Sequence, residues 1–216
     1  MRFGLALAAA LLASGIFATT AAAQAPAPAK ADPAKGQKIA SQVCAACHGA
    51  EGNATAPANP KLAGQVPEYT VKQLMNFRPG PNGRKPERQN AIMLGFAQQL
   101  SPQDMKDVAA FYASQKLVPD VARNKDTIEI GRRIWRGGIA EKGVPACAGC
   151  HGPTGQGIAA QYPLLAGQWT EYTEAQMKAW RSGDRHNDPN GMMRGVAARL
   201  TDAEIRAVSD FIAGLR

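Results

Sequence analysis

Cys44-Ala45-Ala46-Cys47-His48 and Cys147-Ala148-Gly149-Cys150-His151 are two copies of one pattern, C-x-x-C-H. This is the pattern at which a c-type haem is attached. Two thiols about one helical turn apart can each form a thioether bond to a vinyl group of the haem, and the adjacent histidine can ligate the iron from one face. The two motifs use all four cysteines and two of the three histidines of the 216-residue chain. The sequence therefore predicts two covalently bound c-type haems, with Cys44, Cys47, Cys147 and Cys150 as attachment points and His48 and His151 as iron ligands.

Paired cysteines have three other common uses. Four cysteines in an exported protein could form two disulfides, and a C-x-x-C could be a thioredoxin-type redox pair, which needs a strand–helix setting that is not predicted here. Two C-x-x-C knuckles could share a zinc ion, but zinc ribbons separate them by roughly 15–20 residues. Cys147 lies 100 positions after Cys47. None of these uses requires the histidine that follows each motif.

The amino terminus predicts export. A positive Met1-Arg2 precedes an apolar run to Phe17, and Ala21-Ala22-Ala23 offers a cleavage site, so residues 1–23 have the form of a secretory signal peptide. An uncleaved membrane anchor is the alternative, although the apolar run is short for a span. Residues 24–34 form a Pro/Ala tether. We expect a soluble, monomeric protein in the bacterial periplasm, with peripheral membrane association left open.

The second half of the chain repeats the first. Shifted by 103 positions, Cys147 falls on Cys44, and Pro163-Leu-Leu-Ala-Gly-Gln168 falls on Pro60-Lys-Leu-Ala-Gly-Gln65. Beyond a loop that is shorter in the second copy, the offset is 100. Further matched pairs are Tyr69 with Tyr172, Phe77-Arg78 with Trp180-Arg181, Met93 with Met193, and Phe111 with Phe211. A tandem duplication predicts two domains, 35–117 and 128–216, joined by a linker at 118–127.

Each copy predicts a small all-α domain. The last helix of the first copy begins at Ser101-Pro102-Gln103-Asp104, an N-cap serine followed by proline and an acidic residue. The equivalent Thr201-Asp202-Ala203-Glu204 is a capping box. Apolar residues then recur at helical spacing in both copies. Other helices are expected from Gly36 and Gly131 into the two motifs and from near Pro67 and Trp169.

Methionine is the predicted sixth ligand of each iron, because a thioether is the common partner of histidine in electron-carrying cytochromes c. Met93 and Met193 each lie seven positions before the Leu-Ser or Leu-Thr that opens the last helix, so the repeat selects them as a pair. Met192 aligns with Ile92 and is the remaining alternative. His186, the third histidine, lies in a polar loop and is expected to be solvated.

The chain after the tether resembles the dihaem cytochrome c4 family in its doubled C-x-x-C-H, P-x-L-A-G-Q, methionine and terminal helix. The resemblance implies two tandem cytochrome c-type helical domains, each wrapped around one covalent haem and related by a pseudo-twofold axis. It implies His/Met ligation of both irons and propionate edges that meet at the domain interface. It also implies that the carbonyls of Pro60 and Pro163 hold the second nitrogen of each proximal imidazole.

Two further features bear on the cofactor and its partners. Arg78 and Arg181 could pair with haem propionates or simply be solvated, and Tyr69 and Tyr172 could reach a propionate, an interface partner or the core.

The chain carries a formal charge of +8. In the first copy, the basic loop from Arg78 to Arg88 has one acidic residue, Glu87, against four basic residues, Arg78, Arg84, Lys85 and Arg88. The second copy's loop from Arg181 to Asp188 is close to neutral. Such a loop could steer an acidic redox partner. Nucleic acid is a poor partner for an exported haem protein.

Two classes of function remain open. An electron carrier has both irons ligated on two faces, so no substrate site is left. A dihaem enzyme, peroxidase-like or thiosulfate dehydrogenase-like, needs an open iron with acid–base groups beside it, and a subunit of a larger oxidoreductase is a related alternative. Each iron has a methionine here, so we expect a carrier and not an enzyme. The resemblance implies a periplasmic shuttle that feeds a terminal cytochrome oxidase or another redox protein, with a quinol–cytochrome c reductase as a candidate donor.

Overall fold

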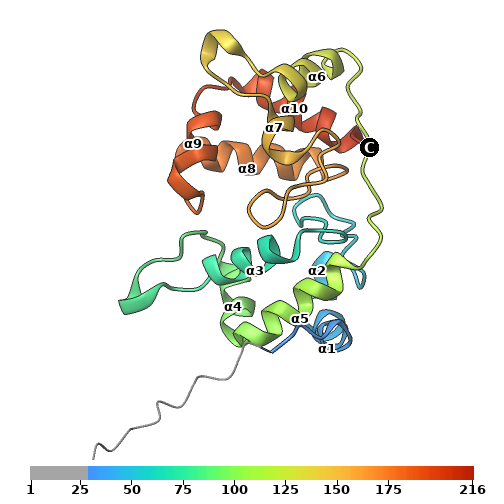
Figure 1. The fold of residues 1–216 in the computed structure, drawn as a ribbon, viewed down its shortest axis with the longest axis vertical. Helices are drawn as coiled ribbons and strands as arrows, with labels where there is room; N and C mark the ends of the chain where they lie inside the picture. The colour runs from blue at the N-terminus through green and yellow to red at the C-terminus, as the bar shows by residue number, and fades with distance from the viewer. Residues whose placement is uncertain (1–28) are drawn as a thin grey trace, which may run out of the picture.

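The computed structural model describes residues 29–216, so the predicted signal peptide and the first five residues of the tether lie outside it. The described chain forms two helical halves stacked along the long axis of the molecule (Figure 1). Apart from three isolated bridges, its regular structure is helical. The first half contains α1 (Pro33–Ile39), α2 (Ala45–His48), α3 (Pro67–Asn76), α4 (Ala91–Gln99) and α5 (Pro102–Ala113). The second contains α6 (Ile128–Gly137), α7 (Cys147–His151), α8 (Thr170–Ser182), α9 (Met192–Ala197) and α10 (Asp202–Gly214).

The first and last helices of each half cross closely, α1 on α5 and α6 on α10. Glycine makes both crossings feasible. A methyl group built on Gly36 would lie 2.0 Å from the carbonyl oxygen of Asp107, and one built on Gly131 would lie 2.3 Å from that of Ala207. The backbones therefore approach more closely than any other side chain would allow. These two glycines occupy equivalent places in the two halves.

Gly36→Ala is expected to destabilise the first half by about 1–3 kcal/mol, the usual cost of overpacking. Alanine favours a helix by about 1 kcal/mol over glycine, but the obstructing atoms are backbone and cannot move without separating α1 from α5. Thermal unfolding followed by circular dichroism measures the effect. Gly95→Ala in α4 is the matched control, because nothing lies within 4 Å of its added methyl group. A control that lowers the melting temperature as much as Gly36→Ala would contradict this explanation.

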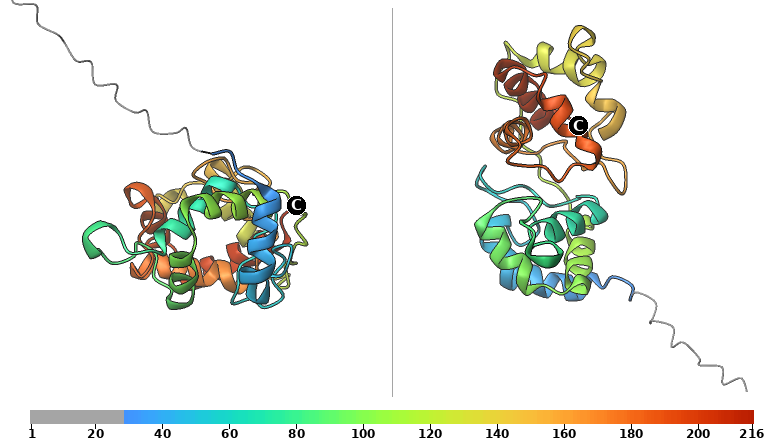
Figure 2. Two further views of the ribbon diagram at one scale, coloured as in Figure 1. Left: turned by 90° about the horizontal axis from the view of Figure 1, so that it is seen from below. Right: turned by 90° about the vertical axis from the view of Figure 1, so that its left-hand side faces the viewer.

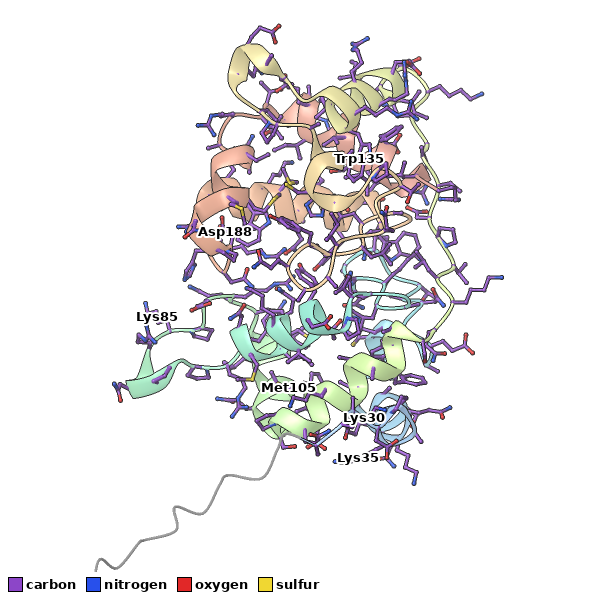
Figure 3. The ribbon with its side chains drawn as sticks, viewed as in Figure 1. Lys30, Lys35, Lys85, Met105, Trp135 and Asp188 are labelled. Atoms are coloured by element: carbon purple, nitrogen blue, oxygen red, sulfur yellow. The ribbon has the colours of Figure 1, made fainter. Side chains whose placement is uncertain are left out.

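The last helices begin as the sequence predicts. Ser101 and Thr201 are N-caps in full capping boxes with Asp104 and Glu204, respectively. The apolar stripes that follow are buried, among them Met105 and Val108 in α5 and Ile205 and Val208 in α10. Trp135 of α6 is fully buried and donates through Nε1 to the carbonyl of Pro153 at 3.1 Å. Figure 3 shows Met105 and Trp135 inside their respective halves.

The halves differ ahead of the C-x-x-C-H motif. In the first half a π-helical turn, Ala40–Cys44, carries α1 directly into α2. In the second half an extra stretch, residues 138–146, follows α6. It folds back as a short 3-10 turn, Ala140–Lys142, with Ile139 and Val144 paired backbone to backbone. The side chain of Val144 is buried against Leu200 and Ile205. The insertion thus caps the core of the second half and leaves α7 in the place that corresponds to α2.

The segment between the halves is docked on both of them (Figures 1 and 2). The Asn53 amide bonds the carbonyl of Lys116 at 2.9 Å and the N–H of Val118 at 2.8 Å. Further along, the Asp210 carboxylate accepts the N–H groups of Arg123 and Asn124 at 2.9 and 3.0 Å. The boundaries 118–127 stay a prediction, but this connection is held along its length by side chains of the first and second halves.

Two glutamines from the repeated P-x-L-A-G-Q segment clamp the halves together. The Gln65 amide donates to the carbonyl of Leu164 at 3.0 Å and accepts its N–H at 2.9 Å. The Gln168 amide makes the same pair of bonds to Lys61, at 3.0 and 2.9 Å. Because Gln65 corresponds to Gln168 and Lys61 to Leu164, each half grips the other through equivalent atoms. This reciprocity is what a pseudo-twofold axis between the halves produces.

None of the helices between residues 29 and 216 combines the length and the apolarity that crossing a bilayer would need.

Candidate haem sites

Helices α2 and α7 carry the two C-x-x-C-H motifs at equivalent places in the two halves. No disulfide joins the two cysteines of either motif. Cys44, Cys147 and Cys150 are half-buried and Cys47 is exposed. Burial raises the pKa of Cys147 to about 11. Thioether attachment at these positions stays a prediction for the individual residues, and the placement of the thiols one helical turn apart fits it.

Each motif histidine is buried and held by a proline carbonyl. His48 and His151 are both 7% exposed. Nδ1 of His48 lies 2.9 Å from the carbonyl oxygen of Pro60, and Nδ1 of His151 lies 3.2 Å from that of Pro163. A carbonyl can only accept, so Nδ1 carries the proton and Nε2 keeps a lone pair for a metal. Burial also lowers the pKa of both imidazoles, which favours the neutral form that binds iron.

The methionines chosen by the repeat lie on short helices that the sequence did not predict. Met93 is half-buried on α4 and contacts the apolar cluster around Phe77 and Leu100. Leu74 of α3 packs against this cluster and also against a second cluster, around Val108 and Tyr112, on which Cys44 packs, so α3 lies between the methionine and the attachment motif. Met193 is half-buried on α9, whereas Met192 is 39% exposed. This difference favours Met193, and ligation by either methionine stays a prediction.

A crossed polar network fills the interface near α3 and α8. Arg88 donates to the hydroxyl of Tyr172 in the other half at 2.6 Å, and Arg185 donates to that of Tyr69 at 2.8 Å. The side-chain oxygens of Gln73 and Gln176 accept from both arginines at 2.8–3.1 Å. Arg88 also lies 4.7 Å from the ring centre of Phe77, and Arg185 lies 4.2 Å from that of Trp180. The two guanidinium groups therefore occupy equivalent places about the pseudo-twofold axis.

This network corrects the charge argument made from the sequence. Arg88 and Arg185 are 9% and 6% exposed, so neither guanidinium is available at the surface to meet a partner. Their equivalence escaped the sequence comparison because they lie 97 positions apart and not 100 or 103. The local patterns Glu87-Arg88-Gln89-Asn90 and Asp184-Arg185-His186-Asn187 could have revealed it.

The two arginines predicted as possible partners of the propionates differ in their contacts. Arg181 pairs with Asp202 at 2.5 Å and donates to the carbonyl of Leu200 at 3.1 Å, on the outside of the second half. Arg78 is half-buried just beyond the end of α3. A propionate role for Arg78 and Arg181 stays untested. Tyr69 and Tyr172 take the interface role. Burial alone would raise the pKa of Tyr69, but Arg185 and Arg88 lower it.

The interface has the character of an anion site. Among the residues that the structure describes, no carboxylate lies within ion-pair distance of Arg88 or Arg185. Buried charges are costly unless an opposite charge accompanies them. At the start of α8, the buried Nε1 of Trp169 and Oγ1 of Thr170 have no hydrogen-bond partner in the described part of the chain. Acidic edges of a porphyrin would satisfy this donor set, so the residues present fit two haems whose propionates face the interface.

Comparison with known proteins gives the same result. A cytochrome c family model matches residues 33–116 and 139–216. The chain is 47% identical over 195 residues to cytochrome c4 of Thiocapsa roseopersicina, covering 89% of this chain and 97% of the relative. It is 39% identical over 198 residues to a thiosulfate dehydrogenase electron acceptor of Stutzerimonas stutzeri (strain A1501), covering 86% and 88%.

A solved structure extends this likeness to three dimensions. The crystal structure of reduced recombinant cytochrome c4 from Pseudomonas stutzeri matches with a TM-score of 0.79 at 42% sequence identity, over 86% of this chain and 100% of that one. Two cytochrome c domains, two C-x-x-C-H motifs and relatives of this similarity lead to one conclusion: the chain belongs to the cytochrome c4 family, binds two c-type haems covalently and serves in electron transfer.

Proposed function

We propose that this protein is a periplasmic one-electron carrier with both irons closed, one by His48 and Met93 and the other by His151 and Met193. The observation that carries the proposal is the matched environment of the two histidines. Each is buried with Nδ1 on a proline carbonyl, and each half has a half-buried methionine on the helix before its last one. A bound haem supplies an iron that gains and loses one electron.

The protein's own residues adapt each site to that task. The carbonyls of Pro60 and Pro163 fix the imidazole rings and make them more basic, which is the usual effect of a hydrogen bond to the second nitrogen of a ligand. A thioether on the opposite face would exclude water and substrates. The cations Arg88 and Arg185 would neutralise acidic groups of the cofactor at the interface, since their protein partners there are neutral oxygens.

For the direction of electron flow, we propose a terminal cytochrome oxidase as acceptor and a quinol–cytochrome c reductase as donor. The family resemblance supports this order. A second candidate is acceptance of electrons from a thiosulfate dehydrogenase, favoured by the relative of that description at 39% identity. In both cases the protein docks with another redox protein and converts no substrate of its own.

If each iron is ligated on both faces, the rate of electron exchange should be far higher than the rate of substrate turnover. Reduction and reoxidation by a small redox protein should be fast, while turnover of peroxide or thiosulfate by the protein alone should be negligible. Stopped-flow absorption of the holoprotein measures the first, and steady-state assays measure the second. A substantial turnover number with native ligation intact would exclude the carrier proposal. Adding membranes that contain an oxidase, or a purified thiosulfate dehydrogenase, then distinguishes the two candidate partners.

A further inference from the structure

The basic loop of the first half, residues 78–90, stands out from the molecule. Figures 1 and 2 show it projecting away from both halves, with the 3-10 turn Pro81–Gly83 at its far end. Arg84 and Lys85 are exposed on it, and Figure 3 shows Lys85 directed away from the body. The N–H of Gly80 donates to the carbonyl of Arg84 at 2.9 Å, which closes the projecting turn.

The base of this loop is fixed, so its tip has a defined position. The N–H of Arg88 donates to the carbonyl of Asn76 at 3.0 Å, and its guanidinium is buried in the interface network. Glu87, the only acidic residue of the loop, accepts from the Asn76 side chain at 3.0 Å. The acid is therefore tied back at the base, beside α3, and the tip presents Arg84 and Lys85 without a carboxylate of the same loop beside them.

An apolar surface follows directly along the chain. Ile92 is 67% exposed and Phe96 is 37% exposed, and they lie one turn apart on α4. Met93, between them in sequence, turns inward against the core. Many protein interfaces have exposed apolar side chains at their centre and polar residues at the rim. This apolar pair also lies on the helix that carries the predicted iron ligand.

The second half has no equivalent of this surface at the matching place. Its corresponding loop is shorter, Arg185 is buried, and the buried carboxylate of Asp188 pairs with Arg194 at 2.9 Å. Asp188 also accepts the N–H of Arg194, which ties the loop to α9. Asp184, the other acid, accepts from Ser182. The two halves therefore share one fold and differ in what they offer to a partner.

We propose that Arg84 and Lys85, together with Ile92 and Phe96, form the docking surface for an acidic redox protein, and that electrons are exchanged through the first half. The proposal rests on the proposed carrier function and adds the surface and the charge of the partner. The cations would act at long range and raise the association rate. The apolar pair would act at contact and slow dissociation, because burial of apolar area is short-ranged.

The test uses the dihaem holoprotein and a blue-copper protein with an acidic surface as probe. Arg84→Glu with Lys85→Glu should lower the association rate at low ionic strength at least tenfold and flatten its salt dependence. Arg133→Glu with Arg136→Glu, on exposed residues of α6 in the other half, makes the same change in net charge and should change the rate less than twofold. Ile92→Ser with Phe96→Ser should accelerate dissociation several-fold and leave the salt dependence unchanged. Surface plasmon resonance measures binding, and stopped flow measures electron exchange.

Equal effects of the two charge reversals would overturn the docking surface while leaving the carrier function intact. Fast electron exchange by the wild type tests the carrier function separately. If the wild type exchanged electrons with no redox protein, the carrier function itself would be contradicted. Vesicles of phosphatidylglycerol and phosphatidylcholine provide the remaining arm. If the wild type binds them and the Arg84/Lys85 variant does not, while the probe protein binds both equally, the loop recognises an anionic membrane surface and this proposal is wrong.

Discussion

Replacing Cys44 and Cys47 with alanine is expected to give a protein with one covalently attached haem where the wild type has two. Thioether bonds are covalent and survive extraction with acidified acetone, whereas a haem held only by iron ligation does not. Haem remaining per chain, measured by absorption after extraction and by mass spectrometry, should therefore fall by half. This effect is the largest expected from any change discussed, because it removes a cofactor around which a small helical domain packs.

The reciprocal change, Cys147→Ala with Cys150→Ala, is the matched control and should leave the haem of the first half. The two variants together assign one haem to each motif. Their absorption spectra should be similar, since the two histidine sites have the same buried imidazole and carbonyl contact. A wild-type chain with a single attached haem, or with zinc in its place, would refute the assignment of both motifs.

Met93→Ala is expected to open the iron of the first half. The ferric wild type should show the weak red absorption band of methionine sulfur bound to iron, and the variant should lose about half of it. The opened iron should then bind cyanide or carbon monoxide, which the wild type excludes. Met193→Ala should have the same effect in the second half.

Met192→Ala provides the control for the second methionine site. Met192 and Met193 are neighbours, but Met192 is exposed and Met193 is half-buried on α9. Its replacement should leave both the red band and the exclusion of carbon monoxide unchanged. If Met192→Ala opens the iron and Met193→Ala does not, the alignment of the repeat is off by one residue.

Much of this molecule follows from local sequence signals. The C-x-x-C-H motifs and the caps at Ser101 and Thr201 each depend on residues close together in the chain, and the 103-residue offset shows that such local patterns occur twice. Together they predict the helical halves and the haems. The helices α4 and α9 were not predicted. Ala91–Gln99 is apolar on most of its faces and lacks a clear stripe, so its helical form depends on packing against the rest of the half.

The interface was the other feature beyond the reach of the sequence. The contacts of Gln65 and Gln168 join atoms 99 and 107 positions apart, and their partners are backbone groups that no side-chain pattern reveals. From the sequence alone, Arg88 and Arg185 are expected at the surface, because arginine is rarely buried without a carboxylate partner. Their burial depends on tyrosines and glutamines of the opposite half and on the cofactor edges that would face them.

The reciprocal contacts between the halves also determine which halves can pair with each other. Lys61 is buried with its ammonium 4.1 Å from the ring centre of Trp169, and the residues at the equivalent positions on the other side of the axis are Leu164 and Val66. If two first halves from different chains met, each would keep the glutamine clamp but bury Lys61 against valine, with no aromatic ring to stabilise the charge. One unlike pair in an otherwise self-complementary surface thus favours the pairing of a first half with a second half over the pairing of two first halves.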